Sequence, residues 1–306
     1  MTQSLFILGR QPFLGLAELE SLYGAETLKS VGFNAALLNM APKDVDFDRL
    51  GGSVKLCTLL NILDTTNWHD IEKYLSKMIP EHLQYVPEGK FKLGLSAYGL
   101  RVSPRDINTT ALRLKKIIKA SGRSVRVIPN KTAELNSAQV LHNQLTSPLG
   151  WELVCLRNGN KTMLGLTVAE QDIEAYAGRD QNRPKRDAKV GMLPPKLAQI
   201  IVNLALSSQP STQTVLDPFC GTGVILQEAL LMGLKVYGTD LDPRMIEYSR
   251  ANLDWLVRRR SGDFEVQLEP GDARSHKWQP VPSAVASEIY LGKPLSRMPE
   301  TLLLQK

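Results

Sequence analysis

Cysteine is scarce in this chain. Its 306 residues include three cysteines, Cys57, Cys155 and Cys220, which lie far apart in the sequence. They have neither the paired spacing of a zinc site nor the even number of a disulfide framework. We therefore expect reduced, mostly buried thiols and no metal centre.

Long apolar runs are also missing. No segment approaches the roughly 20 apolar residues that a membrane-spanning helix needs, and residues 5–8 are too few for the apolar core of a signal peptide. Hydrophobic residues still make up 43% of the chain, enough for ordinary cores, and its length suits about two domains. We expect a globular protein of the cytoplasm with no membrane partner.

Negative charge is nearly absent from one segment. Residues 101–131 hold nine Lys or Arg residues and a single acid, Asp106, although the whole chain carries only +6. A solvated surface normally mixes both signs, so this excess favours nucleic-acid phosphate over a merely solvated helix face. Aromatic residues do not interrupt the segment, which favours recognition of shape and phosphate over base stacking. The candidate phosphate-binding residues are Arg113, Lys115, Lys116, Lys119, Arg123 and Arg126.

Residues 1–176 have the pattern of an α+β region. Strand-like segments occur at 4–8 and 91–96, and a helix is expected from 108 to 120 with Asn108 as its N-terminal cap. Asn158-Gly159 separates two further strand-like runs and predicts a hairpin. This part of the chain should form a mixed sheet with helices.

A polar segment rich in Gly and Pro, residues 177–194, has the composition of an interdomain linker. The third part of the chain, residues 195–306, then opens with a helix that begins at Pro195. The apolar spacing of that helix predicts one inner face. This face consists of Leu197, Ile200, Ile201, Leu204 and Ala205.

A strand, a loop, a helix and a second strand follow one another in this third part. The first strand spans 214–216, the helix runs to Met232, and the second strand, 235–239, ends at Asp240. Such a unit makes the two strands parallel and predicts a doubly wound α/β architecture.

The loop between the first strand and the helix contains Gly221 and Gly223, which let a ligand lie against the main chain. A dinucleotide-binding fingerprint needs a third glycine, and Leu226 stands at that position. The sequence therefore disfavours NAD.

Three acids occur one per strand, at Asp217, Asp240 and Asp272. S-adenosylmethionine (SAM) carries an ammonium group, a ribose diol and an adenine amine, and each of these can donate hydrogen bonds to a carboxylate. This order predicts that Asp217 binds the ammonium, Asp240 the ribose and Asp272 the adenine amine. Helix capping by aspartates is the alternative interpretation.

The motifs Asp217-Pro-Phe-Cys-Gly-Thr-Gly223, Gly238-Thr-Asp240 and Gly271-Asp-Ala273 resemble those of class I SAM-dependent RNA methyltransferases. Pro194-Pro-Lys-Leu-Ala198 resembles the entry helix of the THUMP-domain tRNA guanine-N2 methyltransferases. The resemblance implies a Rossmann-like catalytic domain, tRNA as partner, and methyl transfer to the exocyclic N2 amine of a guanosine. The implied cofactor-binding set is Asp217, Phe219, Cys220, Gly221, Gly223, Asp240, Leu241, Asp272 and Ala273. Cys220 is expected to line the loop rather than to act as a nucleophile.

The N-terminal part resembles the same family less specifically. Leu93-Gly-Leu-Ser96, Ser124-Val-Arg126 and residues 134–139 are similar to a THUMP module, and residues 8–12 and 17–20 to the family's N-terminal segment. The resemblance implies that this region binds tRNA.

The catalytic tetrad of amino-group methyltransferases is an acid or Asn, two prolines and an aromatic residue. Here Ser287-Glu-Ile-Tyr290 follows the fourth strand, so both prolines are absent. Glu288 is the expected acceptor for the amine, and Tyr290 the ring that stacks on the base. The alternative is a strand-edge Glu and a half-buried Tyr.

Class I methyltransferases continue through three more strands, whereas this sequence ends at Lys306. We expect either a fragment or a partner that covers the edge of the fourth strand. Two other functions fit the same motifs: N6-adenine methylation of DNA or RNA, and SAM and RNA binding by a protein whose catalytic loop has decayed.

Overall fold

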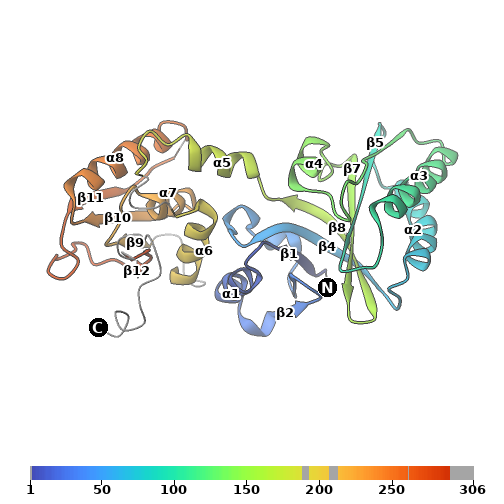
Figure 1. Cartoon of the computed structure of the whole chain (residues 1–306), viewed down its shortest axis with the longest axis horizontal. Coiled ribbons are helices and arrows are strands. Elements are labelled where there is room, and N and C mark those ends of the chain that lie inside the picture. Colours follow the sequence, from blue (N-terminus) through green and yellow to red (C-terminus); the bar gives the residue numbers. More distant parts are fainter. Residues whose placement is uncertain (1, 188–192, 207–212, 261, 290–306) are drawn as a thin grey trace, which may run out of the picture. The chain divides into compact units, whose positions relative to one another are not determined.

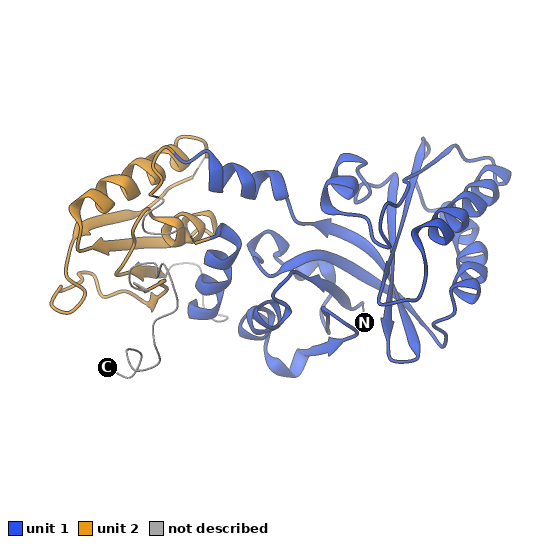
Figure 2. Cartoon of the chain, in the orientation of Figure 1, with its two compact units in different colours: residues 1–183, 194–210 blue, residues 184–193, 211–306 orange. Residues whose placement is uncertain are grey.

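The structure, a computed structural model, describes residues 2–187, 193–206, 213–260 and 262–289. It divides into two compact units (Figure 2). Unit 1 comprises residues 1–183 and 194–210, and unit 2 comprises residues 184–193 and 211–306. Among the described residues, no helix is both long enough and apolar enough to cross a membrane.

Unit 1 is built on one eight-stranded sheet with the order β2-β3-β1-β4-β8-β7-β5-β6 (Figure 1). Neighbouring strands are antiparallel from β2 to β7, whereas β5 is parallel to both β7 and β6. The predicted mixed sheet and the hairpin at Asn158-Gly159 are thus confirmed. The strands are β1 (Ser4–Leu8), β2 (Leu28–Val31), β3 (Ala35–Leu38), β4 (Ser53–Leu63), β5 (Phe91–Tyr98), β6 (Val125–Val127), β7 (Gly150–Asn158) and β8 (Lys161–Glu170).

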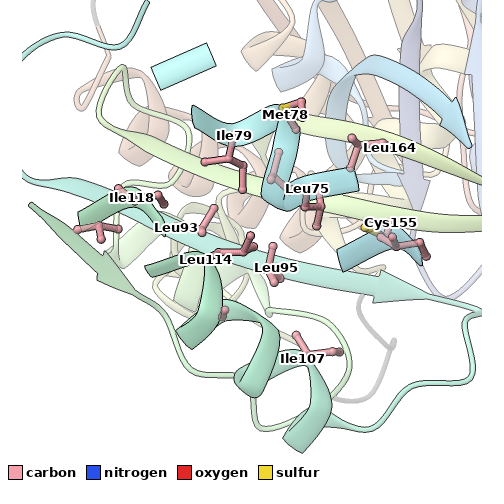
Figure 3. Packing of buried hydrophobic residues seen from close by; sticks show 14 of the residues in the cluster. Leu75, Met78, Ile79, Leu93, Leu95, Ile107, Leu114, Ile118, Cys155 and Leu164 are labelled. Atoms are coloured by element: carbon pink, nitrogen blue, oxygen red, sulfur yellow. The ribbon is translucent and has the colours of Figure 1, made fainter. Parts of the chain in front are cut away.

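The largest core of unit 1 lies between this sheet and two helices, α2 (Trp68–Leu83) and α3 (Pro104–Ala120) (Figure 3). Apolar residues four positions apart share one face of a helix. Each helix therefore turns such a pair toward the sheet, where β5 supplies the opposing leucines. These core residues are Leu75 and Ile79 of α2, Leu114 and Ile118 of α3, and Leu93 and Leu95 of β5.

The expected start of α3 at Asn108 is wrong. The helix begins four residues earlier, because Pro104 has the backbone conformation that a first helical turn needs. The hydroxyl of Ser103 accepts the Asp106 N–H and caps it. Asn108 instead exchanges two hydrogen bonds with the backbone of Asn130.

Unit 1 also contains α1 (Pro12–Tyr23), α4 (Ser137–His142) and α5 (Ile173–Gln181). The helix α6 (Pro195–Leu206), which the sequence placed at the start of the third part, contacts α1 and belongs to unit 1 by its contacts. Its predicted inner face is partly wrong, since Leu204 is 39% exposed. The face that is buried consists of Ala198, Gln199, Ile200, Val202, Asn203 and Leu206.

A buried carboxylate explains why α6 presents polar residues inward. The Glu18 carboxylate of α1 accepts hydrogen bonds from the N–H groups of Gly51 and Gly52 and from the side-chain amide of Asn203. Burial raises the pKa of Glu18, and these hydrogen bonds oppose that rise. The network joins α1, the segment before β4 and α6.

The expected linker, residues 177–194, has regular structure at its start, because α5 continues to Gln181. In unit 2, the backbone of Lys185 exchanges two hydrogen bonds with the side chain of Asn252. Residues 188–192 lie outside the described residues.

Unit 2 has a parallel four-stranded sheet with the order β11-β10-β9-β12. The predicted strand, loop, helix and strand are confirmed, including their parallel pairing. Among the described strands, β12 has only β9 as a neighbour and forms one edge of the sheet. The elements are β9 (Thr214–Asp217), α7 (Val224–Leu231), β10 (Lys235–Asp240), α8 (Pro243–Val257), β11 (Val266–Pro270) and β12 (Ala284–Val285).

The Glu18 network leads to a stability prediction. Glu18→Ala leaves two buried backbone N–H groups and a buried amide without their acceptor, so we expect unfolding to become easier by about 2–4 kcal/mol. Urea denaturation followed by circular dichroism measures the change. The control is Glu20→Ala, which removes an exposed carboxylate from the same helix. Equal stability of the two variants would show that the network contributes nothing.

Candidate cofactor site and basic surface

The glycine loop connects β9 to α7 and needs its glycines for two reasons. Gly221 and Gly223 have φ of 51° and 84°, in the region that favours glycine. A Cβ atom at Gly223 would also lie 2.9 Å from the hydroxyl of Ser249 on α8. The loop therefore keeps a tight turn against that helix.

Leu226 takes the place of the third glycine of a dinucleotide fingerprint, and the structure shows what compensates. A Cβ atom at Gly238 of β10 would lie only 2.4 Å from the Leu226 Cδ1 atom. The missing side chain is thus on the strand rather than on the helix, so α7 packs closely on β10 with a leucine in its first turn.

Asp217 ends β9 and is 2% exposed. Its Oδ1 atom accepts a hydrogen bond of 2.6 Å from the Ser287 hydroxyl and another from the Phe219 N–H. Burial, and then the negative charges of Asp240 and Glu288, raise the pKa of Asp217 to about 7. No ion pair joins Asp217 to any described Lys or Arg. Such a carboxylate is suited to a cationic ligand.

Asp240, at the end of β10, is held by the backbone. Its Oδ2 atom accepts the Gly221 N–H at 3.0 Å, and its Oδ1 atom accepts the Asp242 N–H at the same distance. These bonds fix the carboxylate beside the glycine loop and leave lone pairs for hydroxyl donors. The arrangement agrees with the expected ribose-binding role, which stays a prediction.

Asp272 follows β11 at the same edge of the sheet, since the Gly271 N–H donates to the Asp240 carbonyl. Its carboxylate is bound by the Arg274 guanidinium, with a shortest distance of 2.6 Å. This hydrogen bonding with Arg274 lowers the pKa of Asp272 to about 2. Asp272 therefore remains ionised. If it also binds an adenine amine, as predicted, its carboxylate would accept hydrogen bonds from both that amine and Arg274.

The apolar residues of the expected set have different positions. Phe219 and Leu241 are 43% and 72% exposed beside Asp217 and Asp240, so their side chains are accessible to a ligand. Ala273 is half-buried after β11.

Cys220 is buried, as are Cys57 and Cys155, and all three are free thiols, which confirms the expected state of the cysteines. The Cys220 sulfur lies 3.6 Å from the Ser249 hydroxyl, and burial raises the pKa of its thiol to about 12. A protonated thiol in the interior is a poor nucleophile.

Glu288 and Ser287 follow β12, which pairs with β9, so both residues lie near the end of Asp217's strand. The Glu288 side chain is exposed, and its negative charge contributes to the raised pKa of Asp217. Ser287 received no role in the sequence analysis, although its position just after a strand was a usable signal. Tyr290 lies outside the described residues.

The basic surface of unit 1 falls into two groups. Arg113 forms an ion pair of 2.8 Å with Glu72 of α2, and the Arg123 guanidinium donates to the carbonyls of Val86 and Pro87. These two residues have intramolecular partners that the sequence did not predict. The other four candidates have no ion pair with a described residue; they are Lys115, Lys116, Lys119 and Arg126.

A parallel sheet with a glycine loop and acids at its carboxyl edge defines a Rossmann-like domain of the class I methyltransferase type. Comparison with known proteins agrees. Residues 183–266 match the family described as RMKL-like, methyltransferase domain, which identifies this part of the chain as a methyltransferase domain.

Two relatives extend the identification. Over 102 residues the chain is 54% identical to a tRNA (guanine(10)-N2)-dimethyltransferase of Methanothermobacter thermautotrophicus, covering 33% of this chain and 28% of the relative. Over 123 residues it is 38% identical to a protein of that name from Pyrococcus abyssi, covering 39% and 33% respectively. The chain is thus similar, over part of its length, to proteins named tRNA (guanine(10)-N2)-dimethyltransferase, and it spans about a third of the length of these two relatives.

One solved structure supports the fold. SMU.472 is described as a putative methyltransferase complexed with SAH, which is S-adenosylhomocysteine. The match has a TM-score of 0.54 at 12% identity and covers 99% of this chain and 83% of the SMU.472 chain. SAM is the cofactor of this class, and the uncompensated carboxylate of Asp217 and the backbone-held carboxylate of Asp240 fit its ammonium and ribose groups.

The pKa of Asp217 predicts how binding depends on pH. A proton on Asp217 competes with an ammonium group, so affinity for the product S-adenosylhomocysteine (SAH) should fall by up to about 10-fold per pH unit as the pH is lowered from 7 to 5.5. Asp217→Asn should bind more weakly at pH 7 and lose this dependence. Calorimetry measures both, with the exposed Asp254→Asn as control. A pH dependence that persists in Asp217→Asn would assign the titration to another group.

Proposed function

We propose that the protein transfers a methyl group from SAM to the exocyclic N2 amine of a guanosine in tRNA. The observation that carries the proposal is the buried carboxylate of Asp217 beside the glycine loop, which has no cationic partner among the described residues. It lies within the residues that match the methyltransferase family. The names of the relatives support guanosine in tRNA as the acceptor.

The residues of unit 2 would divide the cofactor among them. Asp217 would hold the ammonium and Asp240 the ribose, with the backbone of Gly221 and Gly223 close to the ligand. Phe219 and Leu241 would supply apolar contact, while Asp272 and Ala273 would face the adenine. SAM carries its methyl group on a good leaving group, so the protein needs no covalent intermediate and has mainly to position the amine.

Glu288 is the proposed acceptor at the catalytic end. An exposed carboxylate just after β12 is accessible to a substrate, and an acceptor for an amine N–H aims the nitrogen lone pair away from itself. Glu288 would also accept the proton that the amine loses as charge develops. Tyr290 is proposed to stack on the base.

For tRNA binding we propose that residues 1–176, which lie in unit 1, form a THUMP-like RNA-binding region. Residues 195–306 would form the catalytic domain in sequence order, with 177–194 between the two. Lys115, Lys116, Lys119 and Arg126 would contact phosphates. Arg113 and Arg123 would contribute less, because each already has intramolecular partners. The cytoplasm is the proposed compartment.

The activity test uses purified protein, tRNA and SAM labelled in its methyl group, followed by identification of the modified nucleoside. We expect N2-methylated guanosine. Glu288→Gln should reduce turnover by about 100-fold or more, as for loss of a general base, with SAH affinity retained. The control is Glu247→Gln, an exposed residue of α8.

Other products would point to other functions. Methylated adenosine would favour an N6-adenine methyltransferase, and SAH binding without any methyl transfer would favour a decayed enzyme. An active protein in which Glu288→Gln has no effect would remove Glu288 from the reaction.

The basic surface predicts a salt dependence. Each phosphate contact contributes about 0.7–0.9 to the slope of log K against log salt. Replacing Lys116, Lys119 and Arg126 by Ala should therefore flatten the slope for tRNA by about two to three units. Fluorescence anisotropy measures it, and the control replaces the exposed Lys29, Lys73 and Lys77. Equal slopes for the two triple variants would show that Lys116 and Lys119 of α3 and Arg126 of β6 are merely solvated.

A further inference from the structure

A second group of cations lies in unit 1, away from α3. Lys196 is in the first turn of α6, and its ammonium donates a hydrogen bond to the side-chain oxygen of Gln171. Gln171 is 4% exposed and is itself held by the carbonyls of Leu50 and Gly51. The Lys196 ammonium is therefore positioned by a buried amide rather than free to move in solvent.

Tyr176 of α5 provides one wall beside this ammonium. The Lys196 nitrogen lies 5.0 Å from the centre of the Tyr176 ring, and the Arg179 guanidinium carbon lies 4.3 Å from the same centre. The ring is fixed, since Tyr176 is buried and its hydroxyl donates to the Gln199 side chain. Two cations thus share one aromatic side chain.

The position of Lys196 is electrostatically unfavourable in the free protein. Partial burial and the positive charge of Arg10 lower the pKa of Lys196, and only the weaker influence of Glu170 opposes this. The first turn of a helix also carries partial positive charge, which disfavours a cation there. The Glu170 carboxylate lies 3.1 Å from the Lys55 ammonium and already has a cationic partner.

Arg10 and Lys196 have no ion pair with any described acid. Arg10 is exposed after β1, and the N–H of the preceding Gly9 donates a hydrogen bond of 2.9 Å to the Gly52 carbonyl. A Cβ atom at Gly51 would lie 2.1 Å from the Lys196 carbonyl oxygen, so Arg10 and Lys196 approach the same segment, residues 51–52. An anion that enters between Arg10 and Lys196 would relieve their repulsion and satisfy donors of both groups. The Lys196 ammonium has two further hydrogens to donate after its bond to Gln171.

We propose that Arg10 and Lys196 form a phosphate-binding site for the RNA backbone, separate from the surface of α3. The choice of RNA rests on the proposed function. The site itself rests on the buried Gln171 anchor and on two cations whose charges are not neutralised by described residues. It would place a phosphate at the start of α6, the helix that precedes the methyltransferase strands in the chain.

The experiment compares two double variants that remove the same charge. Arg10→Gln with Lys196→Gln should flatten the salt dependence of RNA binding by about 0.7–0.9 slope units, the contribution of the one phosphate that the site would hold, and weaken binding at about 0.1 M salt by about 10-fold. The control is Lys29→Gln with Lys43→Gln, two exposed lysines of unit 1. Labelled tRNA and a labelled 20-nucleotide poly(U) are the probes, and fluorescence anisotropy measures binding.

Lys196→Arg keeps the positive charge. It should therefore retain at least half of the difference in salt-dependence slope between the wild-type protein and the double variant. This variant separates loss of a phosphate contact from loss of structure. Circular dichroism and thermal melting confirm that each variant is folded. Equal effects of the two double variants on both RNAs would overturn the proposal.

Methyl transfer is measured separately on the same proteins. A slope that depends on Lys196 in a protein that methylates nothing would leave the phosphate site standing and refute the proposed reaction. Methylation of guanosine together with a slope independent of Lys196 would support the proposed reaction and refute the phosphate site.

Discussion

The buried carboxylate of Asp217 is the constraint on which the functional half of the molecule depends. Burying a carboxylate without a cation is costly, and the structure moderates the cost with the Ser287 hydroxyl and one backbone N–H. The Phe219 N–H is a local donor, whereas Ser287 reaches Asp217 only when β12 pairs with β9. The nearby charge of Asp240 adds to the negative potential at this edge of the sheet, which supports the proposal that a cationic ligand binds there.

Helix α6 belongs to different parts of the molecule by sequence and by contacts. In sequence it lies within residues 183–266, which match the methyltransferase family. In contacts it belongs to unit 1, since Asn203 donates to the buried Glu18 carboxylate. Asn203 therefore faces inward and Leu204 outward. A buried carboxylate without a hydrogen-bond donor costs more free energy than a leucine left partly exposed to solvent. Lys196 lies in the first turn of this helix, and β9 is the next strand along the chain.

Each unit has a local group of charges without ion-pair partners among the described residues, and the two groups have opposite signs. In unit 2 these are the carboxylates of Asp217 and Asp240. In unit 1 they are the cations Lys115, Lys116 and Lys119 of α3, together with Arg10 and Lys196. A cofactor with an ammonium group and a polyanionic RNA would complement these two surfaces respectively. The net charge of +6 does not reveal these local groups because it sums over the whole chain.

Much of the fold and part of the site could be predicted from sequence, where local rules decide. Strand periodicity, the two glycines and one acid after each of three strands predicted the parallel unit and the positions of Asp217, Asp240 and Asp272. Long-range contacts decided the rest. They gave Arg113 and Arg123 intramolecular partners, Asp272 an arginine, and Lys196 a buried anchor. Spacing along a chain determines which face a residue takes, but only the packing of distant segments determines which charges meet a partner.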